Sequence, residues 1–447
     1  MELAGKRVVV VGLGKSGVAA AKLCLARGAH VVGTDSAPPE KVSDEARALG
    51  IELVLGGHAG AKFERADLVV VSPGVPPLSE LTAAELAGVE VIGELELASR
   101  FIQAPIVAIG GTNGKSTTTT LVGDMLIAGG LETFVGGNLG TPTAEAVNGN
   151  FDVVVFEVSS FQLERVPSFQ PRVSVLLNIT EDHLDRYPSF MAYAEAKGNA
   201  FVSQNADDFA IIPEADEDCR RQAQRGKGKL ISFGSYGDYV VSCRTVTETR
   251  TGEMFDLETS ALHGRHNLEN AAAAIAAVRA LDLDPNAVRK ALAAFRPLPH
   301  RMARVATVRG VTFYDDSKGT NVGASVTALR GLSEARGVLI AGGRDKQGAY
   351  EPLVNALVDK GRALVVIGEA AEIIAKAVGA RLPVLRASSM DEAVNQAFSA
   401  AESGDAVLLS PACSSFDMFK SYADRGDRFV SAVQRLAQSE GPGGKSS

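Results

Sequence analysis

A glycine-rich turn that ends in a lysine and a serine is the strongest chemical signal in the sequence. Residues 109–117 read Ile-Gly-Gly-Thr-Asn-Gly-Lys-Ser-Thr, after an apolar run and before a helix-like stretch. Glycines let backbone N–H groups converge on phosphate oxygens, and the N-terminus of the following helix adds partial positive charge. Lys115 would reach the terminal phosphates of ATP, and Ser116 would supply a hydroxyl to Mg²⁺. The turn therefore predicts a site for ATP and magnesium.

This turn departs from the strict phosphate-loop pattern at one position. The pattern GxxxxGK[ST] asks for glycine where the chain has Ile109. A plain glycine-rich turn is the alternative interpretation. The apolar run before the turn and the helix-like stretch after it favour the phosphate loop.

A second glycine-rich turn lies near the start of the chain. It reads Gly-Leu-Gly-Lys-Ser-Gly at residues 12–17, and Asp35 follows 18 residues after Gly17. Taken alone, this is the fingerprint of a dinucleotide site, which makes an NAD-dependent oxidoreductase or a nucleotide-binding module an alternative of another class. The fingerprint alone is weak evidence for hydride chemistry. No catalytic domain for that chemistry follows, whereas the phosphate loop does.

The segments around these turns predict an α/β fold. Short β-branched runs alternate with longer amphipathic stretches, as expected for buried parallel strands joined by crossover helices. An alanine-rich helix is predicted at 271–281, an antiparallel insert at 229–262, and a disordered Gly/Ser-rich tail at 441–447. The strand predictions lie at 8–11, 68–71, 153–156, 173–177, 338–341, 363–367 and 406–409.

Length and two seams predict three domains. The chain has 447 residues, at roughly 150 residues per domain. One seam lies at 93–105, and the other at 296–299, where two prolines end a helical stretch. We place the domains at 1–95, 96–297 and 298–447. The proline-rich seam is also a candidate hinge for a closure that would exclude water from the reaction.

Composition excludes several kinds of partner. The net charge is −8, from 45 Lys and Arg against 53 Asp and Glu, and no long basic run exists, so we expect no nucleic-acid partner and no membrane partner. No run approaches the roughly 20 apolar residues that a membrane helix needs. The first residues lack the features of a secretory signal, and the four cysteines are widely spaced, which fits a reducing compartment. We expect a cytoplasmic monomer.

Several further motifs, taken together with the phosphate loop, resemble one family. The segments 111–117, 157–163, 178–186, 264–270 and 298–301 resemble the motifs of the Mur ligases, which build the peptide of the bacterial cell-wall precursor. The segments 12–17, 316–321 and 410–417 resemble the branch of that family that attaches D-glutamate to UDP-N-acetylmuramoyl-L-alanine. The resemblance runs along nearly the whole chain.

The resemblance implies a fold and a reaction. It implies a Rossmann-like N-terminal domain for the UDP-sugar, a central P-loop ATPase-like domain with a parallel sheet, and a Rossmann-like C-terminal domain for the amino acid. It implies that ATP converts the substrate carboxylate into an acyl phosphate, which the amine of D-glutamate then attacks. Sister Mur ligases that add another amino acid, and folylpolyglutamate-type ligases, remain alternatives within this class.

The resemblance also implies roles for residues at the nucleotide. It assigns catalysis to Lys115, Glu157, His183 and Lys197, and two magnesium sites to Ser116, Glu157, His183 and an N6-carboxylated (carbamylated) Lys197. ATP would bind Gly111, Thr112, Asn113, Gly114, Lys115, Ser116, Thr117, Asn138, Asn267, Asn270, Arg301 and Asp316.

The resemblance also implies which residues bind the two other substrates. The UDP-sugar would bind Gly14, Lys15, Ser16, Asp35, Ser72, Pro73, Gly74, Asn138 and His183. D-glutamate would bind Lys318, Thr320, Lys346, Ser415, Phe416 and Tyr422. The family commonly has Phe at the position of Tyr422, which is harmless if the backbone makes the contact.

Some of these residues have simpler interpretations. Glu157 follows an apolar strand and is alternatively a solvated strand-end charge, and His183 is alternatively a structural histidine. From the residues alone Lys197 is a surface lysine, and Asn267 and Asn270 are candidates for helix capping.

Overall fold

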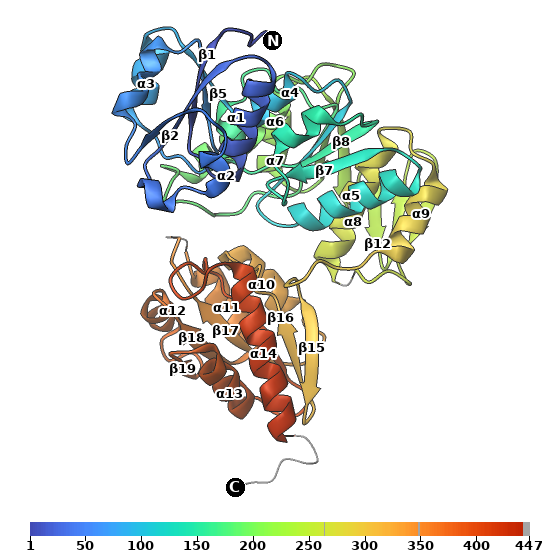
Figure 1. The fold of residues 1–447 in the computed structure, drawn as a ribbon. Coiled ribbons are helices and arrows are strands. Elements are labelled where there is room, and N and C mark those ends of the chain that lie inside the picture. The colour runs from blue at the N-terminus through green and yellow to red at the C-terminus, as the bar shows by residue number, and fades with distance from the viewer. Residues whose placement is uncertain (263, 347–348, 441–447) are drawn as a thin grey trace. The chain divides into compact units, whose positions relative to one another are not determined.

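The computed structural model describes residues 1–262, 264–346 and 349–440. The tail predicted to be disordered, 441–447, lies outside the described residues. The described chain forms three sheets and divides into two compact units. Unit 1 comprises residues 1–179, 194–260 and 267–295, and unit 2 comprises residues 180–193, 261–266 and 296–447. Figure 1 labels many of the elements that follow.

The first sheet of unit 1 is fully parallel. Its strand order is β3-β2-β1-β4-β5, from β1 (Arg7–Val11), β2 (His30–Asp35), β3 (Glu52–Leu55), β4 (Leu68–Val71) and β5 (Glu90–Gly93). Helices α1 (Lys15–Ala26), α2 (Asp44–Arg47) and α4 (Glu94–Ser99) contribute to the core on one face, and α3 (Ser79–Leu86) contributes to the core on the other. The strand order reverses at β1, so the turns after β1 and β4 share one edge of the sheet.

The second sheet of unit 1 carries the phosphate loop. Its order is β14-β13-β12-β11-β10-β9-β6-β8-β7, and the pairs from β7 to β12 are parallel. The strands are β6 (Ile106–Gly110), β7 (Thr133–Gly137), β8 (Val153–Glu157), β9 (Val173–Leu176), β10 (Phe209–Pro213), β11 (Lys229–Gly234), β12 (Tyr239–Ser242), β13 (Thr245–Glu248) and β14 (Glu253–Asp256).

The helices of this region are mostly crossovers. They are α5 (Lys115–Ala128), α6 (Phe190–Val202), α7 (Glu217–Ala223), α8 (Arg265–Arg279) and α9 (Pro285–Ala294). The alanine-rich helix predicted at 271–281 is α8, which begins earlier and is buried from Ala271 to Val278. The insert predicted at 229–262 is antiparallel only in β12–β14. That prediction was wrong for β11, because α7 returns the chain so that β11 pairs parallel to β10.

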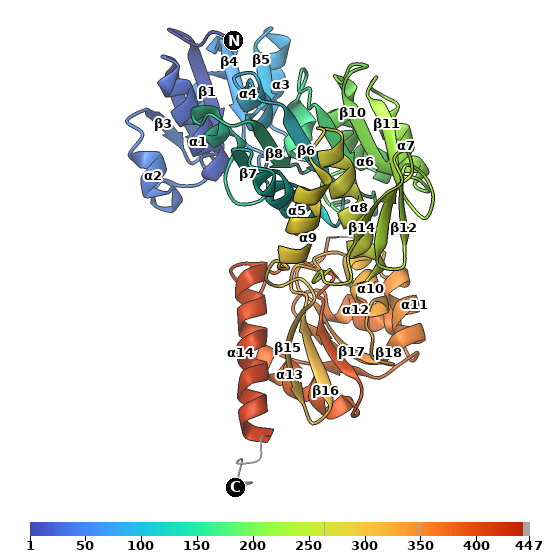
Figure 2. The same cartoon turned by 90° about the vertical axis from the view of Figure 1, so that its right-hand side faces the viewer.

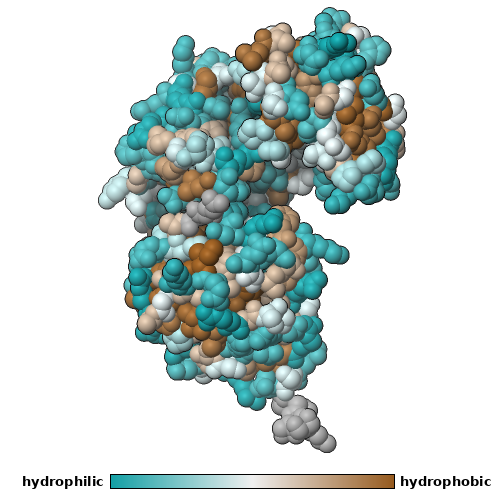
Figure 3. All heavy atoms as spheres, turned by 90° about the vertical axis from the view of Figure 1, so that its left-hand side faces the viewer, coloured by the Kyte–Doolittle hydropathy of each residue, from teal (hydrophilic) through white to brown (hydrophobic). Residues whose placement is uncertain are grey.

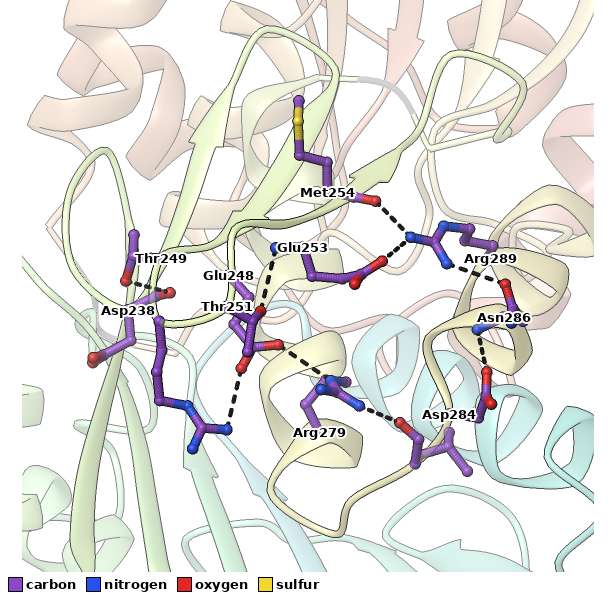
Figure 4. Close-up of polar contacts among 12 residues, drawn as sticks. Asp238, Glu248, Thr249, Thr251, Glu253, Met254, Arg279, Asp284, Asn286 and Arg289 are labelled. Atoms are coloured by element: carbon purple, nitrogen blue, oxygen red, sulfur yellow. Dashed lines mark hydrogen bonds and ion pairs between the residues drawn. The ribbon is translucent and has the colours of Figure 1, made fainter.

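Charged side chains attach the antiparallel strands to α8 and α9 (Figure 4). Glu248 of β13 is 3% exposed, and its Oε2 lies 3.2 Å from Nε of Arg279 in α8. Arg279 also donates to the carbonyl of Leu283 at 2.6 Å. Farther out, Arg289 of α9 pairs with Glu253 of β14, whose side chain is 31% exposed. The two glutamates thus make the same kind of contact at different depths.

Replacing Glu248 with alanine is expected to destabilise the protein strongly. The change leaves the guanidinium of Arg279, whose side chain is 16% exposed, without its buried carboxylate partner, which costs about 3 kcal/mol and lowers Tm by several degrees. The matched change Glu253→Ala breaks an outer pair worth about 1 kcal/mol or less. Thermal unfolding of both variants measures the difference. Equal shifts in Tm would show that burial of the Glu248–Arg279 pair does not matter.

Unit 2 contains the third sheet. Its order is β15-β16-β20-β17-β18-β19, and all pairs are parallel except β15–β16. The strands are β15 (Ala303–Val308), β16 (Val311–Asp315), β17 (Gly337–Gly342), β18 (Gly361–Ile367), β19 (Val384–Arg386) and β20 (Ala406–Leu409). One core includes α10 (Val322–Arg330), α11 (Glu351–Lys360) and α12 (Ala371–Val378), and the other includes α13 (Met390–Ala400) and α14 (Tyr422–Glu440) (Figure 2).

Each of the seven apolar runs predicted as strands lies in a strand of these sheets. The seam predicted at 93–105 falls between β5 and β6, and the seam at 296–299 falls where unit 2 resumes at Arg296. The domain limits 95/96 and 297/298 stay predictions.

The surface is mixed. On the face drawn in Figure 3, hydrophilic residues predominate and hydrophobic ones lie among them. The exposed large hydrophobic side chains are far apart in the sequence, as Leu86, Tyr236 and Phe416 illustrate. In the described part of the chain, every helix is too short or too polar to cross a bilayer.

Candidate active site

The phosphate loop joins the end of β6 to the start of α5. Ile109 is fully buried inside β6, which continues to Gly110. A β-branched residue suits a strand, so the departure from the strict motif at Ile109 is accommodated by the strand. Gly114 has a φ of 86°, and a Cβ there would lie 2.3 Å from Oδ1 of Asn270. The loop therefore requires glycine beside that asparagine.

Two lysines converge on one carbonyl of the loop. Lys115 Nζ donates to the carbonyls of Gly111 at 3.0 Å and Thr112 at 2.9 Å. Lys197 Nζ, from α6, donates to the same Gly111 carbonyl at 2.8 Å. Lys197 is 3% exposed, so its interpretation as a surface lysine is wrong. The two ammonium groups give the loop a local positive charge that fits a polyphosphate.

A buried carboxylate lies at the same edge of the sheet. Glu157 ends β8, pairs with Ile109 of β6 in the parallel register, and is 2% exposed. Its Oε1 accepts from Asn138 Nδ2 at 2.6 Å, and its carbonyl accepts from the Asn138 N–H at 2.9 Å. The solvated alternative for Glu157 is therefore wrong.

These residues fit ATP with magnesium. Gly114 provides a cradle that a side chain would fill, two lysines bring positive charge, and Ser116, 3% exposed, brings a hydroxyl. No three His, Cys, Asp or Glu side chains gather as a metal cage in the described residues. Magnesium suits such a site, because it keeps several waters and binds through one or two carboxylates and substrate phosphates.

The α8 asparagines lie beside the loop. Asn270 is 7% exposed and donates through Nδ2 to Asn267 Oδ1 at 3.3 Å. Because α8 begins at Arg265, both asparagines lie inside the helix, and their interpretation as caps is wrong. The structure thus brings Asn270 beside Gly114 of the phosphate loop.

The N-terminal glycine turn lies at the switch point of the first sheet. A Cβ on Gly17 would lie 1.8 Å from the carbonyl of Gly12, so α1 packs tightly on its own turn. Asp35 accepts from the N–H groups of Leu13 at 2.7 Å and Ala37 at 2.8 Å. Ser72 Oγ donates to the Gly12 carbonyl at 2.7 Å. The predicted residues Gly14, Lys15 and Ser16 open α1 here, and Pro73 and Gly74 follow Ser72.

His183 belongs to a polar cluster in unit 2. The neighbouring Asp182 is buried and accepts from Lys346 Nζ at 3.0 Å and Asn321 Nδ2 at 3.2 Å. Burial raises the pKa of Asp182, but Lys346, His183 and Asn321 outweigh it and hold that pKa below its usual value. Asp182 is therefore an ionised partner of the predicted D-glutamate residue Lys346.

Of the other predicted D-glutamate residues, Tyr422 is the first residue of α14, and the rest lie on two loops that follow the adjacent strands β16 and β20. The Ala412 N–H donates to the Gly319 carbonyl at 2.9 Å and joins the loops. Lys318 Nζ lies 3.9 Å from the ring centre of Tyr422. Thr320 lies on the first of these loops, and the second carries Ser415, which is buried, and Phe416, which is 68% exposed.

Asp316 turns inward from the same edge. It accepts from Ser410 Oγ at 2.7 Å and from the Met302 N–H at 3.3 Å. Burial raises the pKa of Asp316 to about 7, and nearby Arg301 opposes that shift. The side chain of Asp316, predicted to bind ATP, therefore also holds the backbone directly after Arg301.

Two residues of unit 2 that sequence reasoning missed bind the segments that carry the predicted D-glutamate residues. Asp182 could have been noticed because it precedes His183 after a buried run. Arg425 of α14 is fully buried and donates to the Ser317 carbonyl at 2.8 Å and the Cys413 carbonyl at 3.2 Å. Its sequence signal is an arginine on the apolar stripe that continues at Phe429 and Val433.

The predicted residues thus gather within each unit. Unit 1 holds the phosphate loop, Asn138, Glu157, Lys197, Asn267, Asn270 and the N-terminal turn. Unit 2 holds His183, Arg301, Asp316 and the predicted D-glutamate residues.

Three family descriptions match the chain in order. A MurD-like N-terminal domain of Mur ligases matches residues 6–93, the Mur ligase middle domain matches 109–278, and the Mur ligase glutamate ligase domain matches 300–413. The chain belongs to the Mur ligase family. The predicted α/β fold with three domains is confirmed.

Curated relatives share one name. The chain is 44% identical over 449 residues to the UDP-N-acetylmuramoylalanine–D-glutamate ligase of Geotalea daltonii, covering 98% of this chain and 99% of the relative. It is 45% identical over 450 residues to the ligase of the same name from Trichlorobacter lovleyi, covering 98% and 100%.

Solved structures agree on the fold. A pseudomurein peptide ligase type C from Methanothermus fervidus superposes with a TM-score of 0.63 at 19% identity, over 97% of this chain and 100% of that one. The MurF ligase of Thermotoga maritima in complex with ADP superposes with a TM-score of 0.63 at 18% identity, over 98% and 97%.

Proposed function

We propose that the protein is an ATP-dependent ligase that adds D-glutamate to UDP-N-acetylmuramoyl-L-alanine during peptidoglycan precursor synthesis in the cytoplasm. The observation that carries this proposal is the phosphate loop, with Lys115 and Lys197 on the Gly111 carbonyl. It lies in a chain that is 44–45% identical, over nearly its full length, to ligases named for this reaction. We further propose that the protein acts as a monomer.

ATP binds in this proposal at residues 111–117, with Asn138, Asn267 and Asn270 beside the nucleotide. Lys115 leaves the loop carbonyls to contact the terminal phosphates, and Arg301 adds a planar guanidinium that can bind phosphate bidentately. Both cations offset the charge that develops as the γ-phosphoryl group moves to the substrate carboxylate. The resulting acyl phosphate makes an unreactive carboxylate a good electrophile, and the amine of D-glutamate displaces phosphate from it.

Magnesium supplies charge neutralisation between the phosphates and the acceptor. We propose Ser116 and Glu157 for one ion, and His183 with an N6-carboxylated Lys197 for the second. The chain already buries Lys197 beside the loop, where a carboxylated side chain would bring negative charge to a metal. A ¹³C carbamate resonance from labelled bicarbonate that is absent in Lys197→Ala tests the modification, and its absence from the wild-type protein contradicts it.

We propose separate groups of residues for the two other substrates. The UDP-sugar occupies the switch point of the first sheet, at Gly14, Lys15, Ser16, Asp35, Ser72, Pro73 and Gly74, with Asn138 and His183 toward the acceptor. D-glutamate, a dicarboxylate, needs two anion-binding points, which Lys346, Lys318, Thr320, Ser415, Phe416 and Tyr422 provide with nearby N–H groups.

A side-by-side screen of amino acids tests the proposed function. Phosphate release from ATP is measured with UDP-N-acetylmuramoyl-L-alanine and, in turn, D-glutamate, L-alanine, L-lysine or diaminopimelate. Release is expected only when D-glutamate and the acceptor are both present. Release with another amino acid would indicate a sister ligase. Turnover of a nicotinamide cofactor without phosphate release would support the oxidoreductase alternative.

A further inference from the structure

Asn178, two residues after the end of β9, contacts the phosphate loop through both the oxygen and the nitrogen of its side-chain amide. Its Oδ1 accepts from the Asn113 N–H at 2.9 Å, and its Nδ2 donates to the Asn113 carbonyl at 3.1 Å. The backbone continues the same contact, because the Thr112 N–H donates to the Asn178 carbonyl at 3.0 Å. Three hydrogen bonds therefore join one asparagine to two consecutive residues of the loop.

This pattern extends the sheet past its last strand pair. β6 and β9 pair up to Gly110 and Leu176, and the Leu177 N–H donates to the Gly110 carbonyl at 3.1 Å. Both strands have ended beyond that point, and the Thr112 N–H still donates to the Asn178 carbonyl. The side-chain amide of Asn178 offers an N–H donor beside a carbonyl acceptor, as a peptide group does, so it can take the place of a strand partner for Asn113.

The contact fixes the peptide just before the critical glycine. Asn113 precedes Gly114, whose left-handed backbone turns the chain into the first residue of α5, Lys115. A rotation of the Asn113 peptide would change the direction of the N–H groups that follow, which are the groups that a phosphate needs.

We propose that Asn178 is a positioning residue for the nucleotide: its amide clamps the Asn113 peptide and holds the phosphate loop ready for ATP. This inference rests on the proposed function, since it concerns the same ATP site. Asn178 acts through the loop and not through the substrates, so its loss weakens ATP binding selectively.

The test compares full-length wild-type protein with Asn178→Ala in the presence of magnesium. Loss of two neutral hydrogen bonds corresponds to a weakening of roughly 10–100-fold. We expect the Kd for ATP and the KM for ATP to rise by about that factor, while the KM values for D-glutamate and the UDP-sugar change by less than about threefold. Hydrogen exchange at the Asn113 amide should accelerate. Asn178→Ser, which restores one hydrogen bond at most, should fall between the two proteins.

Asn199→Ala is the matched control. The Asn199 side chain also makes two hydrogen bonds, to the Leu163 carbonyl and Arg225, both at 2.9 Å, but none to the loop. It should leave ATP affinity and exchange at Asn113 unchanged. The inference is overturned if Asn178→Ala folds, as judged by Tm, and binds ATP like the wild type. It is also overturned if both asparagine variants, or all three KM values, change equally. Absence of ATP binding by the wild-type protein would instead overturn the proposed function.

Discussion

Replacing Lys115 with alanine is expected to lower ligase turnover by about 1,000-fold or more. Lys115 opens α5, its ammonium lies within 3.0 Å of two loop carbonyls, and in the proposed function it moves from them to the terminal phosphates of ATP. A cation at that place stabilises charge that grows in the transition state, so its removal lowers kcat and not only affinity. Phosphate release with saturating ATP, D-glutamate and acceptor measures the effect.

Two comparisons make this result specific. Lys115→Arg keeps the charge but not the compact ammonium, and we expect it to retain part of the activity. Lys376→Ala removes an exposed lysine from α12 and should leave turnover unchanged. Wild-type turnover in Lys115→Ala would refute the assignment of this loop as the ATP site, because the proposed reaction needs the lysine at the terminal phosphates.

The sheets could be predicted from sequence because burial on both faces leaves a plain signal. A parallel strand such as β1 or β20 is an uninterrupted β-branched or leucine run, which has few other uses in a globular chain. The direction of β11 could not be predicted in this way. Its sequence, KLISFG, carries no pattern that distinguishes a parallel from an antiparallel strand, and its direction is decided by the short helix α7 before it.

Part of the candidate active site could also be predicted from the sequence. The phosphate loop and Glu157 follow apolar strands, and strand ends of a parallel sheet meet at one edge. Lys197 was recognised only by resemblance, since its burial depends on how α6 packs. The hydrogen-bonding roles of Asn178 and Arg425 could not be predicted, because both act on backbone groups from distant parts of the chain, which leave no local pattern.

Replacing Gly114 with alanine is expected to weaken ATP binding by about 100-fold. The change carries two costs. A residue with a side chain disfavours a φ of 86° by about 1–2 kcal/mol, and the new Cβ would lie 2.3 Å from Asn270 Oδ1, so the loop or α8 must move. Either movement disturbs the N–H groups that open α5. Titration of ATP with magnesium, together with Tm, separates binding from stability.

Gly130 provides the matched control at the other end of α5. Its φ is 85°, almost the same as that of Gly114, but a Cβ there meets no atom within 4 Å. Gly130→Ala should therefore lose a similar 1–2 kcal/mol of stability and keep the ATP affinity of the wild type. If both variants lost affinity equally, backbone strain alone would explain the effect. If neither did, the close approach of Asn270 to the loop would have no part in nucleotide binding. A loss confined to Gly114→Ala would show that the space between Gly114 and Asn270 is needed for the nucleotide.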